Sequence, residues 1–182
     1  MGTITPLFKS RKPPVEQIDN VKNTFLLGLS AMMLFTMEGT PPMLENSSCS
    51  FGRHTVCFDQ LMASLGNPNE KKVILDDFIK MLYRTFVQEA VFVVEDYCER
   101  SGQSDLLYVQ PWYPFAKAIK DCFSNGFRFG MDLAVNDSMP IRWRKKLITE
   151  NMRGESLQSS FFDFDDAWDL VDEIRNFVVS ID

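Results

Sequence analysis

Four polar side chains near the middle of the chain have the types and spacing that can hold an anion. Lys120, Asp121, Ser124 and Asn125 close the segment 111–126, which reads PWYPFAKAIKDCFSNG. On a helix, side chains four and five positions apart lie close together, so Lys120 would be near Ser124 and Asn125. An ammonium, a hydroxyl and an amide can together bind a phosphate group. The pattern therefore predicts a phosphate-type pocket.

The same segment has a purely structural interpretation. Pro114 suits the first turn of a helix, where its missing N–H costs nothing. Asn125 followed by Gly126 is typical of a helix C-cap, and Lys120 favours the negative end of the helix. The sequence leaves both interpretations open.

A second basic group follows, and it lies next to an acidic stretch. Residues 111–153 carry eight basic and four acidic residues, a net charge of +4, whereas residues 154–182 carry one basic and eight acidic residues, a net charge of −7. A basic edge could bind an anionic ligand, or it could pair with the acidic stretch inside the fold. The members of this edge are Arg142, Arg144, Lys145 and Lys146.

Composition limits the classes of function. The 182 residues carry a net charge of −6, which argues against a general nucleic-acid coat protein. Four cysteines without a C-x-x-C pair and a single histidine, His54, predict no metal site, no cofactor and reduced thiols. The apolar run 25–35 is too short to span a bilayer and too far in for a signal peptide, so we expect a cytoplasmic protein.

The hydrophobic pattern predicts a mainly α fold. A flexible arm, 1–14, is expected before a single helical domain, 15–182. Helices are expected over 15–37, 56–65, 70–100 and 111–126, with a last helix after Asp163. Strand-like alternation over 127–135, then over 141–149 and briefly over 155–157, places a small antiparallel hairpin or meander before that C-terminal helix. Within the first helix, Phe25, Leu26 and Met33 are expected on one buried face.

The segment 111–126 also resembles a family motif. The pattern P-W-Y-x-F-A-x-x-I, followed by Lys-Asp-x-x-Ser-Asn, is similar to that of HEPN-type helical domains, and the likeness extends over about residues 70–182. In that superfamily an arginine precedes a histidine by five positions. The resemblance puts Lys120 at the arginine position, Asp121 at the polar position beside it and Asn125 at the histidine position.

The resemblance implies a site that lacks the histidine that would act as its general base. In catalytic members the arginine stabilises the phosphate while the histidine moves protons during metal-free RNA cleavage, often across a dimer interface. Asn125 does not titrate near neutral pH, and one positioned proton-transfer group contributes about 10²–10⁴-fold in rate. Lys120 is a point charge where the arginine is a bidentate fork. Both departures indicate a protein that does not cut RNA.

Three hypotheses follow. The first is a non-catalytic, homodimeric HEPN-like domain that binds a nucleotide, RNA or protein partner. The second is a pure protein-interaction module with no small ligand, which an exposed apolar patch on 25–35 or on 127–135 would favour. The third is an active metal-independent RNase with another acid–base group, such as Glu89 or Asp121.

Overall fold

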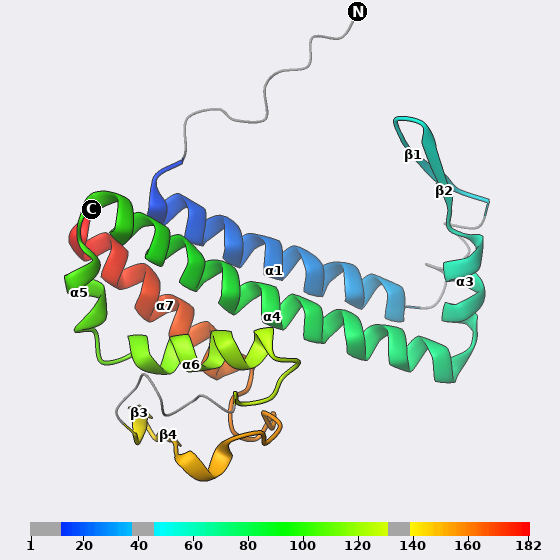
Figure 1. Cartoon of the computed structure of the whole chain (residues 1–182). Coiled ribbons are helices and arrows are strands. Elements are labelled where there is room, and N and C mark those ends of the chain that lie inside the picture. Colours follow the sequence, from blue (N-terminus) through cyan, green and yellow to red (C-terminus); the bar gives the residue numbers. More distant parts are fainter. Residues whose placement is uncertain (1–11, 38–45, 131–138) are drawn as a thin grey trace, which may run out of the picture. The chain divides into compact units, whose positions relative to one another are not determined.

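The computed structural model describes residues 12–37, 46–130 and 139–182. Within these ranges the chain is mainly α, and a small antiparallel hairpin precedes the C-terminal helix, as the sequence predicted (Figure 1). A second antiparallel strand pair lies earlier in the chain. The helices are α1 (Pro14–Thr36), α3 (Asp59–Gly66), α4 (Pro68–Ser101), α5 (Ser104–Tyr108), α6 (Tyr113–Ser124) and α7 (Phe164–Ile181). The strands are β1 (Ser48–Phe51), β2 (His54–Cys57), β3 (Ile141–Trp143) and β4 (Lys146–Ile148), and a 3₁₀ turn covers Glu150–Met152.

The chain divides into two compact units. Unit 1 contains Phe86–Asp182 together with the described residues up to Lys22, and unit 2 is Asn23–Thr85. Helices α1 and α4 each contribute to both units. Residues 1–11 of the predicted arm lie outside the described residues, and the single domain over 15–182 stays a prediction.

Unit 1 is built around the second half of α4. That half is apolar on most of its circumference, and α6 and α7 bury their own apolar faces in the same core. Helix α7 starts at a capping box, in which Asp163 and Asp166 each accept a hydrogen bond from the other's backbone N–H. The fully buried large side chains of this core are Phe86, Phe115, Phe123, Phe129, Phe162, Leu107, Ile119, Ile148, Leu170, Ile174, Val87 and Ile18.

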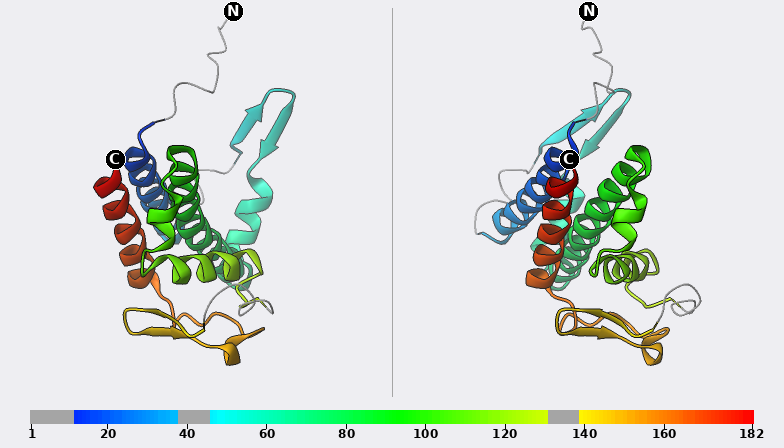
Figure 2. Two further views of the ribbon diagram at one scale, coloured as in Figure 1. Left: turned by 60° about the vertical axis from the view of Figure 1, so that its left-hand side comes forward. Right: turned by 90° about the vertical axis from the view of Figure 1, so that its left-hand side faces the viewer.

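An aromatic cluster fixes the β3–β4 hairpin to α6. The ring of Phe115 on α6 stacks on Trp143 of β3, with centroids 4.9 Å apart, and Phe162 packs against both rings. The hairpin thereby lies at the N-terminal end of α7 (Figure 2). This position brings the basic edge to the acidic first turns of α7.

The strands differ from the prediction. Residues 141–149 form a tight hairpin in which Trp143 pairs with Lys146, so the expected single strand is wrong. The reversal occurs at Arg144, whose φ is +49°, a left-handed conformation that the alternating pattern does not signal. Of the expected strand 127–135, residues 127–130 contribute only an isolated bridge between Arg128 and Ser156, and the remainder lies outside the described residues.

Unit 2 contains a hairpin that the sequence did not predict. Strands β1 and β2 pair in antiparallel register around Gly52, and β2 includes the first two residues of the helix expected over 56–65. All four residues of β2 are exposed, so no in-and-out alternation marks it in the sequence. His54 lies in this exposed strand. Cys49 is opposite Val56, and none of the four cysteines forms a disulfide.

Helices α1 and α4 contact each other closely within unit 2. A Cβ atom at Gly28 would lie 2.4 Å from Cδ2 of Leu82, so only glycine allows this approach without a shift of the leucine. Phe25 is 5% exposed on the same side of α1, as expected. Helix α3 adds the buried side chains of Met62 and Leu65.

Candidate functional site

The ammonium of Lys120 is bound by a carboxylate of the neighbouring helix. Its Nζ lies 2.9 Å from Oε1 and 2.7 Å from Oε2 of Glu95 on α4, and the two side chains are 25% and 27% exposed. Tyr113, in the first turn of α6, donates its hydroxyl to Oε1 of Glu95 over 3.0 Å. The cation that was expected to hold a phosphate is therefore already neutralised.

Tyr113 acts as a fixed donor in this cluster. Burial of its hydroxyl, reinforced by the charge of Glu95, raises the pKa of the phenol well above its ordinary value. The phenol thus stays protonated at physiological pH and keeps its hydrogen bond to the carboxylate. No pattern in the sequence links Glu95 to Lys120, because the two residues are 25 positions apart.

Ser124 and Asn125 satisfy the end of α6. Ser124 Oγ donates to the carbonyl of Lys120 over 3.1 Å and accepts from Gln88 Nε2 over 2.9 Å. The backbone N–H of Asn125 donates to the carbonyls of Asp121 and Cys122, and its side chain donates to the carbonyl of Arg128. Asn125 is therefore the C-cap of α6, as the structural interpretation of this segment predicted, whereas the last turn of α6 contains no basic residue. Gly126 completes the cap with a φ of +66°.

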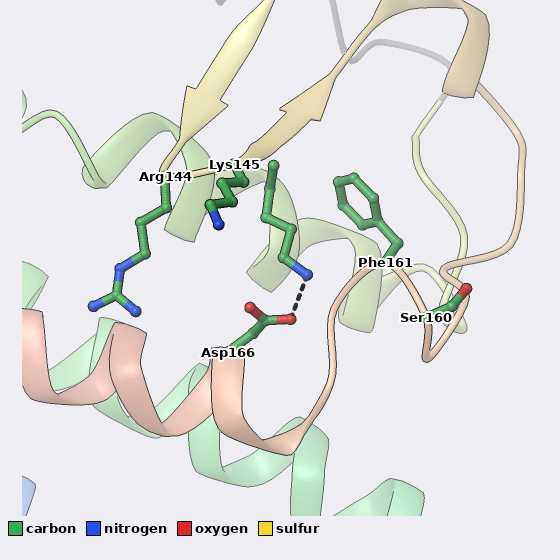
Figure 3. Close-up of a pocket in the computed structure, with 6 residues that line it drawn as sticks. Arg144, Lys145, Ser160, Phe161 and Asp166 are labelled. Carbon is green, nitrogen blue, oxygen red and sulfur yellow. Dashed lines mark ion pairs between the residues drawn. The ribbon is translucent and has the colours of Figure 1, made fainter.

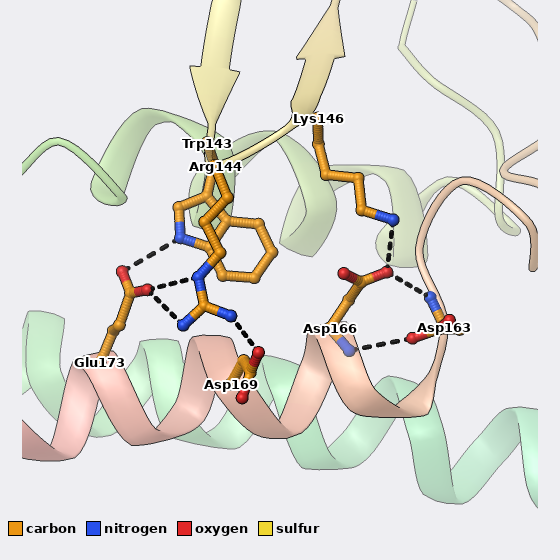
Figure 4. A network of polar contacts seen from close by, with 7 residues as sticks. All are labelled: Trp143, Arg144, Lys146, Asp163, Asp166, Asp169 and Glu173. Atoms are coloured by element: carbon orange, nitrogen blue, oxygen red, sulfur yellow. Dashed lines mark hydrogen bonds and ion pairs between the residues drawn. The ribbon is translucent and has the colours of Figure 1, made fainter.

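The basic edge pairs with α7. Arg144 forms ion pairs with Asp169 and Glu173, and its guanidinium lies 4.9 Å from the ring centroid of Trp143 (Figure 4). The indole N–H of Trp143 donates to Glu173 over 3.0 Å. These two carboxylates raise the pKa of Arg144 although partial desolvation lowers it. Arg142, the residue between the two buried side chains of β3, is exposed.

Lys146 joins the same network at the start of α7. Its Nζ lies 2.7 Å from Asp166 Oδ2, which also accepts the backbone N–H of Asp163 over 3.0 Å. Pairing between the basic edge and the acidic stretch, left open by the sequence, is thus confirmed at Arg144 and Lys146. The carboxylates of α7 neutralise these two members of the edge from within the same unit.

A shallow cavity of about 550 Å³ lies beside this network. Lys145 and Phe161 line it together with the paired residues Arg144, Lys146 and Asp166 (Figure 3). Lys145, at the turn of the hairpin, has no ion pair with any residue that the structure describes. One unpaired ammonium among several carboxylates gives a weak anion site.

Helix α1 has an exposed apolar face in unit 2, and the sequence had predicted that part of this face would be buried. Leu26 and Met33 were expected in the core, yet they are 46% and 65% exposed. The period of the helix was predicted correctly, but the covered side is that of Phe25 and Gly28. We call the outward side the α1 apolar face. Its members are Leu26 (46% exposed), Leu27 (71%), Met33 (65%), Leu34 (54%) and Met37 (59%), the last directly after the helix.

The segment that carries this face has no charge at all. Residues 23–37 read NTFLLGLSAMMLFTM, fifteen residues without Asp, Glu, Lys, Arg or His. An exposed helix surface ordinarily carries charged side chains. The apolar patch named above as favouring a protein-interaction module is therefore present on α1.

Other candidate groups have no comparable arrangement. Glu89 is exposed on α4. Burial raises the pKa of the Cys122 thiol to about 12, so this side chain is a neutral part of the core. In residues 12–37, 46–130 and 139–182, no cluster of His, Cys, Asp and Glu could hold a metal ion.

Comparisons with protein families, with curated proteins and with solved structures find no match to this chain. The HEPN-like resemblance consequently stays a prediction. Across the part of the chain that the structure describes, every helix is too short or too polar to cross a membrane.

Proposed function

We propose that this protein is a non-catalytic helical interaction domain, HEPN-like in kind, that binds a protein partner through the α1 apolar face. The observation that carries the proposal is the exposure of Leu27 and Met33 within a segment of fifteen uncharged residues. A helix that is apolar on both sides is normally covered on both sides. Among the residues of unit 2 that the structure describes, only those on the side of Phe25 and Gly28 are covered.

The size of the face suits a binding surface. Five Leu and Met side chains, each about half exposed or more, leave on the order of 500 Å² of apolar surface in water. Covering that area would contribute roughly 10 kcal/mol before the cost of association is subtracted. A surface of this kind on a helix is typical of helix-to-helix recognition.

Binding of a nucleotide or RNA has less support. An anion at Lys120 would have to displace Glu95, whose two oxygens hold the ammonium at 2.9 and 2.7 Å. At the hairpin only Lys145 offers an ammonium without a described ion-pair partner. An active RNase has less support still, because the amide of Asn125 cannot move a proton and Glu89, one of the alternative acids, is exposed on α4.

A photo-crosslinking amino acid at Leu27 tests the proposal in cells. We expect a discrete protein adduct from this position and none from Thr24, an exposed residue on another side of α1. Equal yields at both positions, or no adduct at Leu27, would contradict the proposal. In parallel, RNA affinity that falls with salt and is lost in Lys145→Ala would favour the ligand-binding hypothesis instead.

A further inference from the structure

We infer that the partner is a second copy of this chain, whose own α1 packs antiparallel on the α1 apolar face about a two-fold axis near Ser30. The inference rests on the proposed function and specifies its partner. It follows from the symmetry of the exposed side chains along α1.

The exposed residues are arranged symmetrically around Ser30. Leu26 and Leu27 precede it by four and three positions, and Met33 and Leu34 follow it by three and four positions. In an antiparallel pair centred on Ser30, Leu26 of one copy meets Leu34 of the other, and Leu27 meets Met33. An isologous interface requires this kind of self-complementarity, whereas a surface for a different protein does not.

Steps of three and four residues place this set on one side of α1. The pattern continues outward, because Asn23 and Met37 stand seven positions before and after Ser30 and are also exposed. Steps of three, four and seven positions are those of a helix that packs along another helix. The face therefore extends over about four turns, from residue 23 to residue 37.

Ser30 provides a small central residue. Its hydroxyl donates to the carbonyl of Leu26 over 2.8 Å, so its one donor is satisfied inside the helix. A small side chain at the crossing point allows two helix axes to approach closely, while the larger side chains on either side interdigitate. The centre of the symmetric pattern thus has the side chain that a crossing point favours.

Charge does not oppose this pairing at the contact. The whole chain has a net charge of −6, so two copies repel one another through most of their surfaces. Residues 23–37 carry no charge, so they give two copies an approach surface without like-charge contacts.

The inner side of α1 is consistent with the same assembly. Within unit 2, α1 already contacts α4 at Gly28 and Leu82. Two such helix pairs, joined through their α1 helices, would make a four-helix arrangement in which each α1 is covered on both sides. A single helix pair buries only one side of each helix.

Cysteine crosslinking tests the geometry. The background carries Cys49→Ser and Cys57→Ser, because the two other native cysteines are buried. We expect Ser30→Cys to form disulfide-linked dimers under mild oxidation, and Thr24→Cys to form none. A mixture of Leu27→Cys and Met33→Cys proteins should yield the mixed dimer, whereas a parallel pair would link each variant to itself and contradict the two-fold arrangement.

Sedimentation equilibrium tests the association without a crosslink. We expect a dimer that Leu27→Glu weakens on the order of a hundredfold or more, because a carboxylate would be buried in the contact. Thr24→Glu is the matched control and should leave the dimer unchanged, and circular dichroism verifies that both variants fold. A protein that is monomeric at every concentration overturns the inference. The proposed function still stands if Leu27 then crosslinks to a different protein, and it fails as well if Leu27 crosslinks to none.

Discussion

Lys120 on α6 and Glu95 on α4 form an ion pair in which the ammonium lies within 2.9 Å of both carboxylate oxygens. The pair joins two helices of unit 1 and is about three-quarters buried. Tyr113 donates to the same carboxylate. Lys120, which the sequence predicted in a phosphate pocket, thus forms a contact between two helices.

Removal of one partner of this pair should destabilise the fold. Lys120→Met leaves the partly buried Glu95 without its counter-ion, which we expect to lower the free energy of unfolding by about 1–3 kcal/mol, between the values for exposed and fully buried pairs. Lys117→Met on the same helix is the control and should cost less than 0.5 kcal/mol, roughly the range for surface changes. Urea denaturation at pH 7 measures both.

The double variant separates the ion pair from other effects of the substitution. We expect Lys120→Met combined with Glu95→Gln to cost less than the sum of the two single changes, because the second change removes the unpaired charge. Strict additivity would show that the two groups do not stabilise each other. Lys120 would then again be a candidate cation for binding an anionic ligand.

Glu173 should be required for the packing of the hairpin. It accepts the indole N–H of Trp143 and the guanidinium of Arg144 at once, each at 3.0 Å. Glu173→Ala leaves a buried indole donor unsatisfied, so we expect a loss of about 1–3 kcal/mol. Glu173→Gln keeps an acceptor for the indole and loses only the charge, so its cost should be smaller. Equal losses in thermal denaturation would contradict the role of the indole hydrogen bond.

The effect of Gly28→Ala on the free energy of unfolding should change sign when Leu82 is shortened. A Cβ at Gly28 would approach Leu82 to 2.4 Å, so Gly28→Ala must displace that side chain, and we expect a net destabilisation of up to about 2 kcal/mol. Alanine favours a helix over glycine by about 1 kcal/mol. In a Leu82→Ala background, where the obstruction is gone, Gly28→Ala should therefore stabilise. Urea denaturation of the four proteins tests this, and the same sign in both backgrounds would be inconsistent with the contact.

Helices were predictable from the sequence because their signals are local. The periodic apolar residues of 15–37 and 70–100, and the caps at Asn125 and Asp163, lie within a few positions of the structure that they determine. The strands were less predictable from the sequence, as Arg144 shows. Its left-handed conformation turns one apparent strand into a hairpin, and any alternating pattern is compatible with either outcome.

The environment of the candidate site was not predictable, because it depends on contacts between distant residues. Nothing near Lys120 in the sequence indicates that Glu95 will neutralise it. The exposure of Met33 has a related cause. Periodicity shows that Leu26 and Met33 share a side of α1, but a helix that is apolar on two sides does not reveal which side its neighbour covers.

Asp163 should make the stability of α7 depend on pH. Hydrogen bonds from the backbone N–H of Asp166 hold the pKa of the Asp163 carboxyl below its ordinary value. The unfolded chain therefore binds this proton more tightly than the folded one does, so the stabilisation is complete above about pH 4. It is lost as the pH falls further, because a protonated carboxyl is a weaker acceptor for the capping N–H.

Two substitutions at Asp163 separate the cap from the charge. Asp163→Ala should lower the free energy of unfolding by about 1 kcal/mol at pH 7, and the difference from the unmodified protein should shrink as the pH falls below 4. Asp163→Asn keeps a capping oxygen that does not titrate, so it should retain most of the stability at pH 7 and show a weaker loss in acid. Denaturation midpoints measured from pH 7 to pH 3 test both expectations. A constant difference between Asp163→Ala and the unmodified protein over that range would show that the ionised carboxylate does not stabilise the cap.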